Sequence, residues 1–390
     1  MKDHECMRIV IDCRWIRSSN LDGIGRYLLE LLRKLLVAPG RQEYMLLFAD
    51  TARRDWVTSQ LGEQVRRDAY STQVLGYDVL TLRDVLRLRH DVAKLSPDAY
   101  FSPMYLAWPF SKQYRTLFVV FDLIPFVRPE VCTTLRWKLF YRMPFFARAI
   151  FRRADRILTA SEHTKQDIMR LFGIPSEKII QVCAGASPAF TEQVSDEDKK
   201  AIRLRYHLPD KYLLCVSRQQ PYKNLSTLIR AYELLSADMQ AEYRLVLTGA
   251  RHHLYTDDLE QSVQKLVEQG KVIFTGYVED ADLAGLYQMA SLFVFPSLYE
   301  GFGLPVVEAM AAGCPVVSSH AASLPEVGGD AAVYFDPASE QNMAETITAV
   351  LQDRERWPAM VRRGREQAKK FTWEKAAADV SQVLTRQNCR

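Results

Sequence analysis

The residues best suited to chemistry are two glutamates, Glu300 and Glu308, on either side of a glycine-containing turn. An apolar run at 292–296 predicts a strand before this turn, and Pro305 fits the first turn of a helix that Gly313 would end. A helix N-terminus that follows a strand binds anions. Carboxylates, in contrast, accept hydrogen bonds from hydroxyl groups. The pattern therefore points to a ligand that carries both an anionic group and hydroxyl groups.

Two other interpretations of this pair of glutamates stay open. In one, both carboxylates are solvated and merely complement the positive end of the helix dipole. In the other, they are the acid and nucleophile of a glycosidase. The glycosidase interpretation is disfavoured, because such catalytic carboxylates normally come from separate elements.

A second set of candidates lies at residues 217–224 (SRQQPYKN), directly after a predicted strand. Arg218 and Lys223 can neutralise a diphosphate there, Arg through paired hydrogen bonds and Lys as a point charge. The alternative is that both are solvated surface cations. A diphosphate held by these cations, with hydroxyl groups on Glu300 and Glu308, describes a nucleotide sugar.

A third candidate is the turn formed by Gly23 and Gly25, which opens a predicted helix at 24–36. This turn resembles a phosphate-binding turn. Leu28, however, occupies the place of the third glycine in the dinucleotide-binding fingerprint. The sequence therefore argues against a conventional NAD site.

Short β-rich runs alternate with helical patterns along the whole chain, which is typical of βα units that build a parallel sheet. The predicted strands are 8–12, 44–48, 116–121, 156–159, 212–216, 244–247, 272–274, 292–295, 315–318 and 332–335. We expect two doubly wound α/β domains, at 1–190 and 201–370, with the polar stretch 191–200 between them. A last helix within 371–390 either caps the second domain or crosses back to the first. Facing strand ends would form the ligand-binding cleft.

Composition excludes several classes of protein. The 390 residues are 48% hydrophobic and 25% charged, as in ordinary globular proteins. No run approaches the about 20 apolar residues of a membrane span, and no secretory signal is expected at the N-terminus. The seven cysteines contain no C-x-x-C pair, which indicates neither a disulfide framework nor a zinc site. We therefore expect a reducing cytoplasm.

Charge is distributed unevenly along the chain. Residues 1–190 carry 29 Lys and Arg against 20 Asp and Glu, whereas residues 191–390 carry 22 against 27. Residues 135–153 (LRWKLFYRMPFFARAIFRR) hold six basic residues, no acidic ones and several aromatic ones, and Pro144 is expected to break them into two helices. Such a segment suits an anionic membrane surface. The alternative is a core helix whose arginines extend to water.

The chain resembles a known family, glycosyltransferase family 4 of the GT-B fold, and specifically its mannosyltransferase-like bacterial branch. The resemblance covers nearly the whole chain. The segments that carry it are residues 9–32, 121–126 (FDLIPF), 154–168, 216–232 and 274–337, together with the region around Trp373. The two glutamates with Arg218 and Lys223 are its most specific part.

The resemblance implies that 1–190 is an acceptor-binding domain and 201–370 a nucleotide-sugar-binding domain. It also implies a role for each candidate residue. Glu300 would bind hydroxyls of the donor sugar, Glu308 would hold the ribose hydroxyls, and Arg218 and Lys223 would hold the diphosphate. Backbone N–H groups of Gly301, Phe302, Gly303 and Leu304 would meet sugar and phosphate, the Gly23–Gly25 turn would approach the diphosphate from the other domain, and the backbone of Tyr277 and Val278 would lie near the base. Transfer would retain the anomeric configuration, need no metal ion, and accompany a C-terminal helix that crosses back.

The chain departs from the family pattern at Phe121. Many relatives carry His-Asp where this chain has Phe121 followed by Asp122, and that histidine touches the donor sugar. Phenylalanine forms no such hydrogen bond, so the usual sugar contact is in doubt. Asp122 remains a candidate catalytic residue, and His163 is a candidate substitute.

The leading hypothesis is transfer of a sugar, with mannose from GDP-mannose as the suggested donor, to a lipid-linked oligosaccharide or polysaccharide precursor at the inner face of the cytoplasmic membrane. No nucleic-acid partner is expected. One alternative is a sugar-nucleotide epimerase, which the spacing of Glu300 and Glu308 does not support. Another is a catalytically inactive, membrane-associated scaffold of the same fold, for which Phe121 is the hint.

Overall fold

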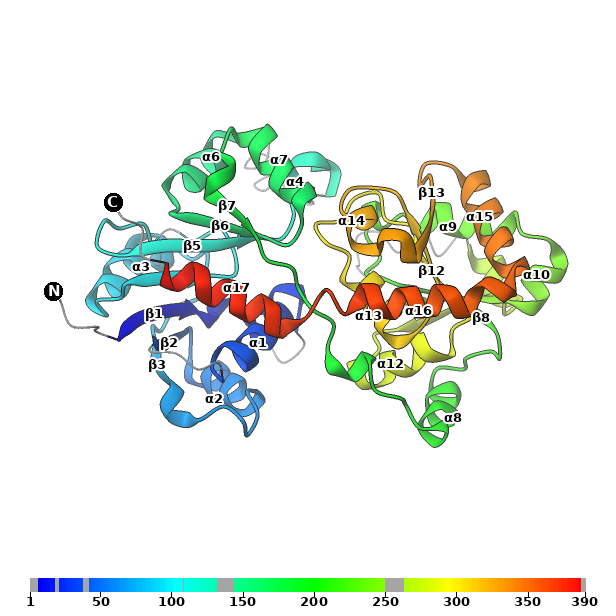
Figure 1. The fold of residues 1–390 in the computed structure, drawn as a ribbon, viewed down its shortest axis with the longest axis horizontal. Helices are drawn as coiled ribbons and strands as arrows, with labels where there is room; N and C mark the ends of the chain where they lie inside the picture. The colour runs from blue at the N-terminus through cyan, green and yellow to red at the C-terminus, as the bar shows by residue number, and fades with distance from the viewer. Residues whose placement is uncertain are drawn as a thin grey trace. The chain divides into compact units, whose positions relative to one another are not determined.

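The computed structural model describes residues 6–17, 21–37, 42–107, 109–131, 144–249 and 263–386. The chain divides into two compact units (Figure 1). Unit 1 consists of Met1–Leu123, Arg142–Ala184 and Trp373–Arg390, and unit 2 consists of Ile124–Tyr141 and Gly185–Thr372.

Unit 1 is built on a parallel sheet in the order β3-β2-β1-β4-β5-β6-β7. The strands are β1 (Met7–Asp12), β2 (Gln42–Phe48), β3 (Tyr70–Val74), β4 (Ala99–Ser102), β5 (Arg115–Val120), β6 (Arg156–Thr159) and β7 (Ile179–Gln181). The central strands β1, β4 and β5 are almost entirely buried. This burial explains why β1 and β5 appear in the sequence as apolar runs rather than as alternating patterns.

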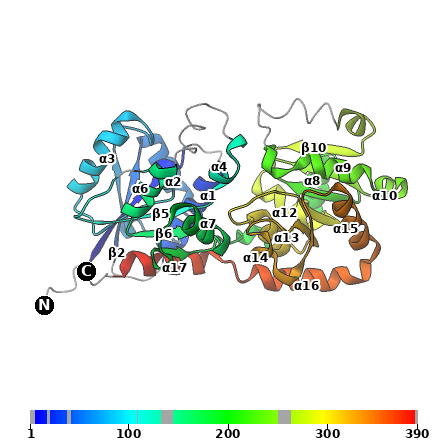
Figure 2. The same cartoon turned by 90° about the horizontal axis from the view of Figure 1, so that it is seen from above.

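Helices connect these strands. They are α1 (Gly23–Leu35), α2 (Thr51–Gln60), α3 (Leu82–Lys94), α6 (Pro144–Arg153), α7 (Glu162–Phe172) and α17 (Trp373–Thr385), with 3-10 turns at Cys13–Trp15, Arg67–Ala69 and Ser176–Lys178. The C-terminal helix α17 packs against α1, where Lys34 pairs with Glu374 at 2.7 Å and the rings of Tyr27 and Trp373 lie 5.5 Å apart. Figure 2 shows α17 and α3 on opposite sides of the strands of unit 1.

Unit 2 contains a second parallel sheet, in the order β10-β9-β8-β11-β12-β13. Its strands are β8 (Tyr212–Val216), β9 (Arg244–Thr248), β10 (Val272–Gly276), β11 (Leu292–Phe295), β12 (Val316–Ser319) and β13 (Ala332–Phe335). Its helices are α4 (Ile124–Val127), α8 (Asp196–Arg205), α9 (Leu225–Glu233), α10 (Ala237–Glu242), α12 (Asp280–Met289), α13 (Leu304–Ala312), α14 (Leu324–Gly328), α15 (Glu340–Gln352) and α16 (Trp357–Ala368). The 3-10 turns are Pro129–Val131, Pro188–Phe190, Pro221–Lys223, Gly329–Ala331 and Arg354–Arg356.

The predicted fold class, two α/β units with parallel sheets, is confirmed. The sequence did not predict β3, β4 and β7, which are short or partly polar. The polar stretch 191–200 is partly helical, because α8 begins at Asp196 with Ser195 as its N-cap. Within residues 135–153, α6 begins at Pro144, and 135–143 lie outside the described residues. No helix in the described ranges is long and apolar enough to cross a membrane.

Candidate active site

The candidate site of unit 2 lies where β8 and β11 end. These strands are hydrogen-bonded neighbours in the centre of the sheet and run parallel, so their carboxyl ends meet at one edge. The loop at 217–224 follows β8, and the turn at 296–303 follows β11 and leads into α13. In open α/β sheets this edge is the usual place for a ligand.

Hydrogen bonds from Leu298 and Asn224 tie the two loops together. The backbone N–H of Leu298 donates to the carbonyl of Tyr222 at 2.8 Å. The buried amide Nδ2 of Asn224 donates to the carbonyls of Pro296, at 3.1 Å, and Pro337, at 2.8 Å. Asn224 adopts φ 60°, a left-handed conformation that asparagine tolerates better than most residues. Asn224 thus starts α9 and locks the cationic loop onto the end of β11.

Because of this locking, Lys223 and Glu300 meet although 77 residues separate them. Lys223 Nζ donates to Glu300 Oε1 at 2.6 Å, and their side chains are only 13% and 11% exposed. The Lys223 ammonium also lies 5.4 Å from the centre of the Phe295 ring. A partly buried ion pair of this kind retains further hydrogen-bonding capacity, since an ammonium has three donors and a carboxylate has four lone-pair positions.

The second glutamate is held on the helix behind the turn. Glu308 lies in α13 and is 4% exposed, and Tyr287 of α12 donates its hydroxyl to Glu308 Oε2 at 3.2 Å. Burial, and after it the nearby charge of Glu308, holds the pKa of Tyr287 well above its ordinary value. Tyr287 therefore remains a neutral donor that orients this carboxylate.

The conformation of the turn between the two glutamates depends on a glycine and on contacts to the turn's backbone. Gly303 has φ 114°, and a Cβ there would lie 2.7 Å from Leu324 Cδ2, so both conformation and space favour glycine. The buried hydroxyl of Ser323 lies 2.9 Å from the carbonyl oxygen of Glu300 and 2.7 Å from that of Phe302. The Phe302 ring packs on Phe371 with centroids 5.4 Å apart. Glu300 is consequently presented by a turn that the structure fixes from several sides.

Some functional candidates were missed in the sequence. Asn224 and Ser323 hold the site together, but only their tertiary partners reveal this. Two buried polar atoms at the same edge, Gln219 Oε1 and Ser297 Oγ, have no hydrogen-bond partner among the residues that the structure describes. Gly249, at the end of β9, lets the backbone approach closely, because a Cβ there would lie 2.0 Å from the carbonyl oxygen of Ser217.

The remaining candidates of unit 2 follow strand ends at the same edge of this sheet or belong to the turn before α13. Arg218 belongs to the same loop as Lys223, but its side chain is exposed, and within the described part of the chain it forms no ion pair with Glu300. Val278 is buried just after β10, whereas the neighbouring Tyr277 is 55% exposed. Gly301 lies in the turn before α13, and Leu304 is the first residue of α13.

The candidates of unit 1 lie at the ends of its own strands. Gly23 begins α1, and the N–H of Gly25 already donates to the N-cap Asp22 at 2.8 Å. Asp122 follows β5. The ring of Phe121 packs edge-on against the buried Tyr27, with centroids 4.8 Å apart.

His163, the candidate substitute for the histidine of the family pattern, lies close to an acidic side chain of its own helix. His163 lies in the first turn of α7, and its Nε2 lies 3.4 Å from Asp167 Oδ2.

A family model described as "Glycosyl transferases group 1" matches residues 196–370, which include the whole site of unit 2. An O-antigen chain mannosyltransferase B from Escherichia coli is 31% identical over 375 residues, covering 91% of this chain and 93% of that protein. The chain belongs to the glycosyl transferases of group 1. The family resemblance deduced from the sequence is thereby confirmed.

A longer protein and a solved structure also resemble this chain. The serotype-specific mannosyltransferase WbdA of Escherichia coli is 32% identical over 270 residues, which is 68% of this chain but only 32% of that protein. The chain therefore spans about a third of the length of these relatives. A crystal structure of Anabaena Alr3699/HepE in complex with UDP and glucose superposes with a TM-score of 0.74 at 18% identity, covering 97% of this chain and 99% of that one. This likeness establishes the GT-B fold.

Proposed function

We propose that this group 1 glycosyl transferase moves mannose from GDP-mannose, with retention of anomeric configuration, to a lipid-linked glycan precursor. The observation that carries the proposal is the contact between Lys223 and Glu300 at the carboxyl edge of the unit 2 sheet, directly before α13. It places a cation, a hydroxyl-accepting carboxylate and a helix N-terminus together. These three groups are complementary to the phosphates and hydroxyl groups of a sugar diphosphate.

The proposed chemistry depends on the negative charge that develops on the leaving diphosphate during transfer. As the bond between the sugar and the diphosphate breaks, negative charge accumulates on the leaving oxygen. Lys223, with help from Arg218 and from the N-terminus of α13, is proposed to stabilise this charge. The Lys223 ammonium would keep one N–H on Glu300 and direct another to phosphate. Glu300 would accept hydrogen bonds from sugar hydroxyls with its remaining lone pairs.

The other assignments complete the donor site. Glu308, oriented by the Tyr287 hydroxyl, is proposed to bind the ribose hydroxyls, and the backbone at Val278 to lie beside the base. Gly23, Gly25 and Asp122 are proposed to contribute from unit 1. Mannose is favoured because relatives of this chain are named mannosyltransferases.

The acceptor is proposed to be lipid-linked, as suits a relative named for the O-antigen chain. The protein would then act in the cytoplasm as a peripheral protein on the inner face of the membrane. Within the predicted membrane segment, α6 buries Ala147, Ile150 and Phe151 but leaves Phe145 56% and Phe146 39% exposed. The described part of the segment thus combines a core-packing face with an exposed aromatic face beside arginines.

The test measures release of nucleoside diphosphate and formation of glycosylated lipid from GDP-mannose, UDP-glucose and other nucleotide sugars. Lys223→Ala and Glu300→Ala are expected to abolish transfer while the circular dichroism spectrum stays native. Lys211→Ala is the matched control, because Lys211 is an exposed lysine that pairs with Glu242 before β8.

The outcomes separate the competing functions. Product whose new bond keeps the donor's anomeric configuration supports a retaining transferase. Conversion of the sugar nucleotide into an isomer would indicate an epimerase, and no turnover of any donor would indicate an inactive scaffold. Near-normal turnover by Lys223→Ala would contradict the site assignment.

A further inference from the structure

After β7 the chain leaves unit 1 and passes into unit 2 at Gly185. We call residues 187–194 the crossing segment; it contains the 3-10 turn Pro188–Phe190 and ends before α8. Figure 1 shows this segment in green beside α12. The turn packs against both α12 and α13, the helices that carry Tyr287 and Glu308. The crossing segment therefore supports the elements that hold the second glutamate of the site.

Phe190 is the residue of the crossing segment that contacts the tyrosine behind this glutamate. Its side chain is 1% exposed, and its ring packs edge-on against the Tyr287 ring, with centroids 5.8 Å apart and an angle of 75° between the planes. Edge-to-face packing is a favoured arrangement of two aromatic rings. Phe190 consequently restricts the orientation of the Tyr287 ring, and this orientation determines where the phenolic oxygen lies.

The Tyr287 hydroxyl transmits the restriction to the carboxylate. It donates to Glu308 Oε2 at 3.2 Å, where Tyr287 is 0% and Glu308 4% exposed. This distance is at the long end for a hydrogen bond between two oxygen atoms. A small displacement of the ring would therefore break the bond and leave the buried carboxylate without this donor.

Gln288, the next residue of α12, holds the same segment by polar contacts. Its Nε2 donates to the carbonyl of Glu192 at 2.7 Å, and its Oε1 accepts a hydrogen bond from the N–H of Val194 at 3.1 Å. Two successive residues of α12 thus bind the crossing segment, one through a ring and one through an amide. The position of the segment and the position of this part of α12 are fixed relative to each other.

We propose that Phe190 is a positioning residue for the nucleotide: through the Tyr287 ring it holds the carboxylate of Glu308 where the ribose hydroxyls bind. The inference rests on the proposed function, in which Glu308 accepts hydrogen bonds from the ribose. Phe190 acts through Tyr287 rather than by touching the nucleotide, because it is buried and carries no polar side-chain atom. Coupling between two binding events is reciprocal, so a nucleotide on Glu308 must also stabilise the crossing segment.

A second route from Phe190 to the site runs through β11. The Tyr287 ring also packs on Phe293, with centroids 5.3 Å apart, and Phe293 packs on Phe295 at 5.7 Å. Phe295 is the ring beside the Lys223 ammonium. This route does not need the Tyr287 hydroxyl, whereas the proposed route does. A double-mutant cycle separates the two.

The test is such a cycle, measured on nucleotide affinity in the full-length protein. GDP, UDP and ADP are the probes, and the one that the wild type binds most tightly is titrated by calorimetry. Phe190→Leu is expected to weaken binding by about threefold to tenfold, and Tyr287→Phe by about tenfold or more. The double variant is expected to bind within about twofold of Tyr287→Phe, because the hydroxyl through which Phe190 acts is already absent.

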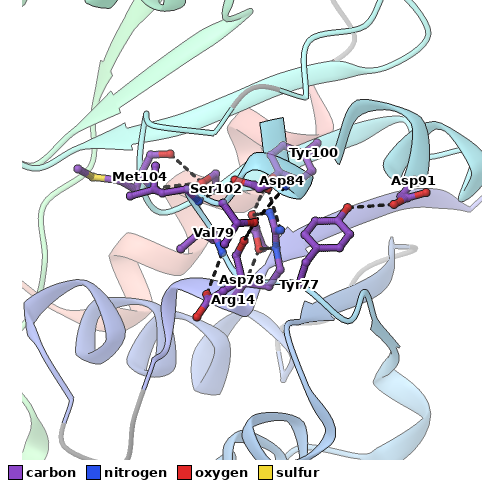
Figure 3. Close-up of polar contacts among 12 residues, drawn as sticks. Arg14, Tyr77, Asp78, Val79, Asp84, Asp91, Tyr100, Ser102 and Met104 are labelled. Atoms are coloured by element: carbon purple, nitrogen blue, oxygen red, sulfur yellow. Dashed lines mark hydrogen bonds and ion pairs between the residues drawn. The ribbon is translucent and has the colours of Figure 1, made fainter. Parts of the chain in front are cut away.

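Matched controls come from buried aromatic residues of unit 1. Phe172→Leu removes a ring that is also 1% exposed and packs edge-on, with its centroid 4.8 Å from that of Phe151. Tyr100→Phe, in the cluster of Figure 3, removes a buried hydroxyl that likewise donates to a carboxylate, Asp12 Oδ2, at 2.5 Å. Both controls are expected to lower the temperature of thermal unfolding and to keep the nucleotide affinity of the wild type.

Hydrogen exchange measures the reciprocal effect. The N–H of Phe190 donates to the carbonyl of Ser187 at 3.0 Å, and that of Thr191 to the carbonyl of Pro188 at 2.9 Å, so their exchange reports opening of the crossing segment. Saturating nucleotide is expected to slow this exchange by about threefold or more in the wild type and not in Tyr287→Phe. This comparison needs no variant at Phe190, so it is decisive even if Phe190→Leu does not fold.

The outcomes distinguish this inference from the proposed function. Binding of no nucleotide by the wild type would overturn the proposed function, and the inference with it. Wild-type binding that Phe190→Leu leaves unchanged, or weakens as much in the Tyr287→Phe background as alone, would overturn the inference and leave the proposed function standing. Equal weakening by Phe172→Leu, or exchange that nucleotide slows equally in the wild type and Tyr287→Phe, would do the same.

Discussion

Lys223 and Glu300 form a 2.6 Å ion pair at the carboxyl ends of two neighbouring strands, with both side chains nearly removed from solvent. The pair joins the cation assigned to the diphosphate with the carboxylate assigned to the sugar. We therefore expect a change in one group to alter how strongly the other would bind its part of the donor.

A first prediction follows from this coupling. Glu300→Gln removes the negative charge that partly neutralises Lys223, so under the proposed donor-site assignment GDP is expected to bind several-fold more tightly. Transfer is expected to fall by about a hundredfold or more, because the sugar hydroxyls lose their charged acceptor. Isothermal titration calorimetry with GDP and a transfer assay test the two parts. Weaker GDP binding in Glu300→Gln would show that the ion pair organises Lys223 rather than competing for it.

Asn224→Ala tests how the two loops are joined. The substitution leaves the carbonyls of Pro296 and Pro337 without their buried donor and places alanine at φ 60°. The free energy of unfolding is expected to fall by about 2–4 kcal/mol. Urea denaturation measures the change. Gln341→Ala is the control, because this exposed amide of α15 donates only to Glu345 one turn further along the helix. An equal effect there would contradict a special role for Asn224.

Arg14→Met tests the buried network that anchors α3. Arg14 donates to both oxygens of Asp12, at 2.8 Å each, and to Asp84. Methionine would leave two buried carboxylates uncompensated, so the free energy of unfolding is expected to fall by about 3–5 kcal/mol. The exposed Arg17 provides the control substitution Arg17→Met. Pairing Arg14→Met with Asp84→Asn should restore part of the loss, and a fully additive double variant would argue against direct coupling.

Alkaline pH should destabilise the fold through buried tyrosines. Burial raises the pKa of Tyr232 from 10.0 to about 12, and its hydroxyl donates to the carbonyl of Tyr243 at 2.9 Å. Since the pKa is higher in the folded state, the contribution of Tyr232 is complete below pH 10 and is lost as the pH rises toward 12. The loss is expected to be on the order of 2 kcal/mol.

Urea denaturation between neutral pH and pH 11 measures this slope. Tyr232→Phe removes the ionisable group, so its free energy of unfolding should decline less steeply with pH than that of the wild type. Tyr277→Phe, at an exposed tyrosine, should follow the wild type. If the free energy of unfolding declined equally with pH in all three proteins, ionisation of Tyr232 would not be the cause of the alkaline loss of stability.

Many of the strands could be predicted from the sequence because central parallel strands are buried on both faces. Strands such as β8 and β11 therefore appear as uninterrupted apolar runs followed by glycine, proline or polar loops. The edge strand β3 (YSTQV) is only partly buried and lacks this pattern. The N-cap of α8 inside the polar stretch 191–200 was missed because composition alone resembled a linker.

What the sequence determined by itself was local: the strand–turn–helix around Glu300, the cationic loop with Lys223, and the chemistry that these residue types allow. Only the tertiary structure decided that Lys223 contacts Glu300, that Asn224 and Ser323 hold both loops, and that α3 turns leucines outward while Asp84 lies inside. The reason is physical. Periodicity records the conformation of each segment, whereas these contacts depend on which strands become neighbours and on partners tens of residues away.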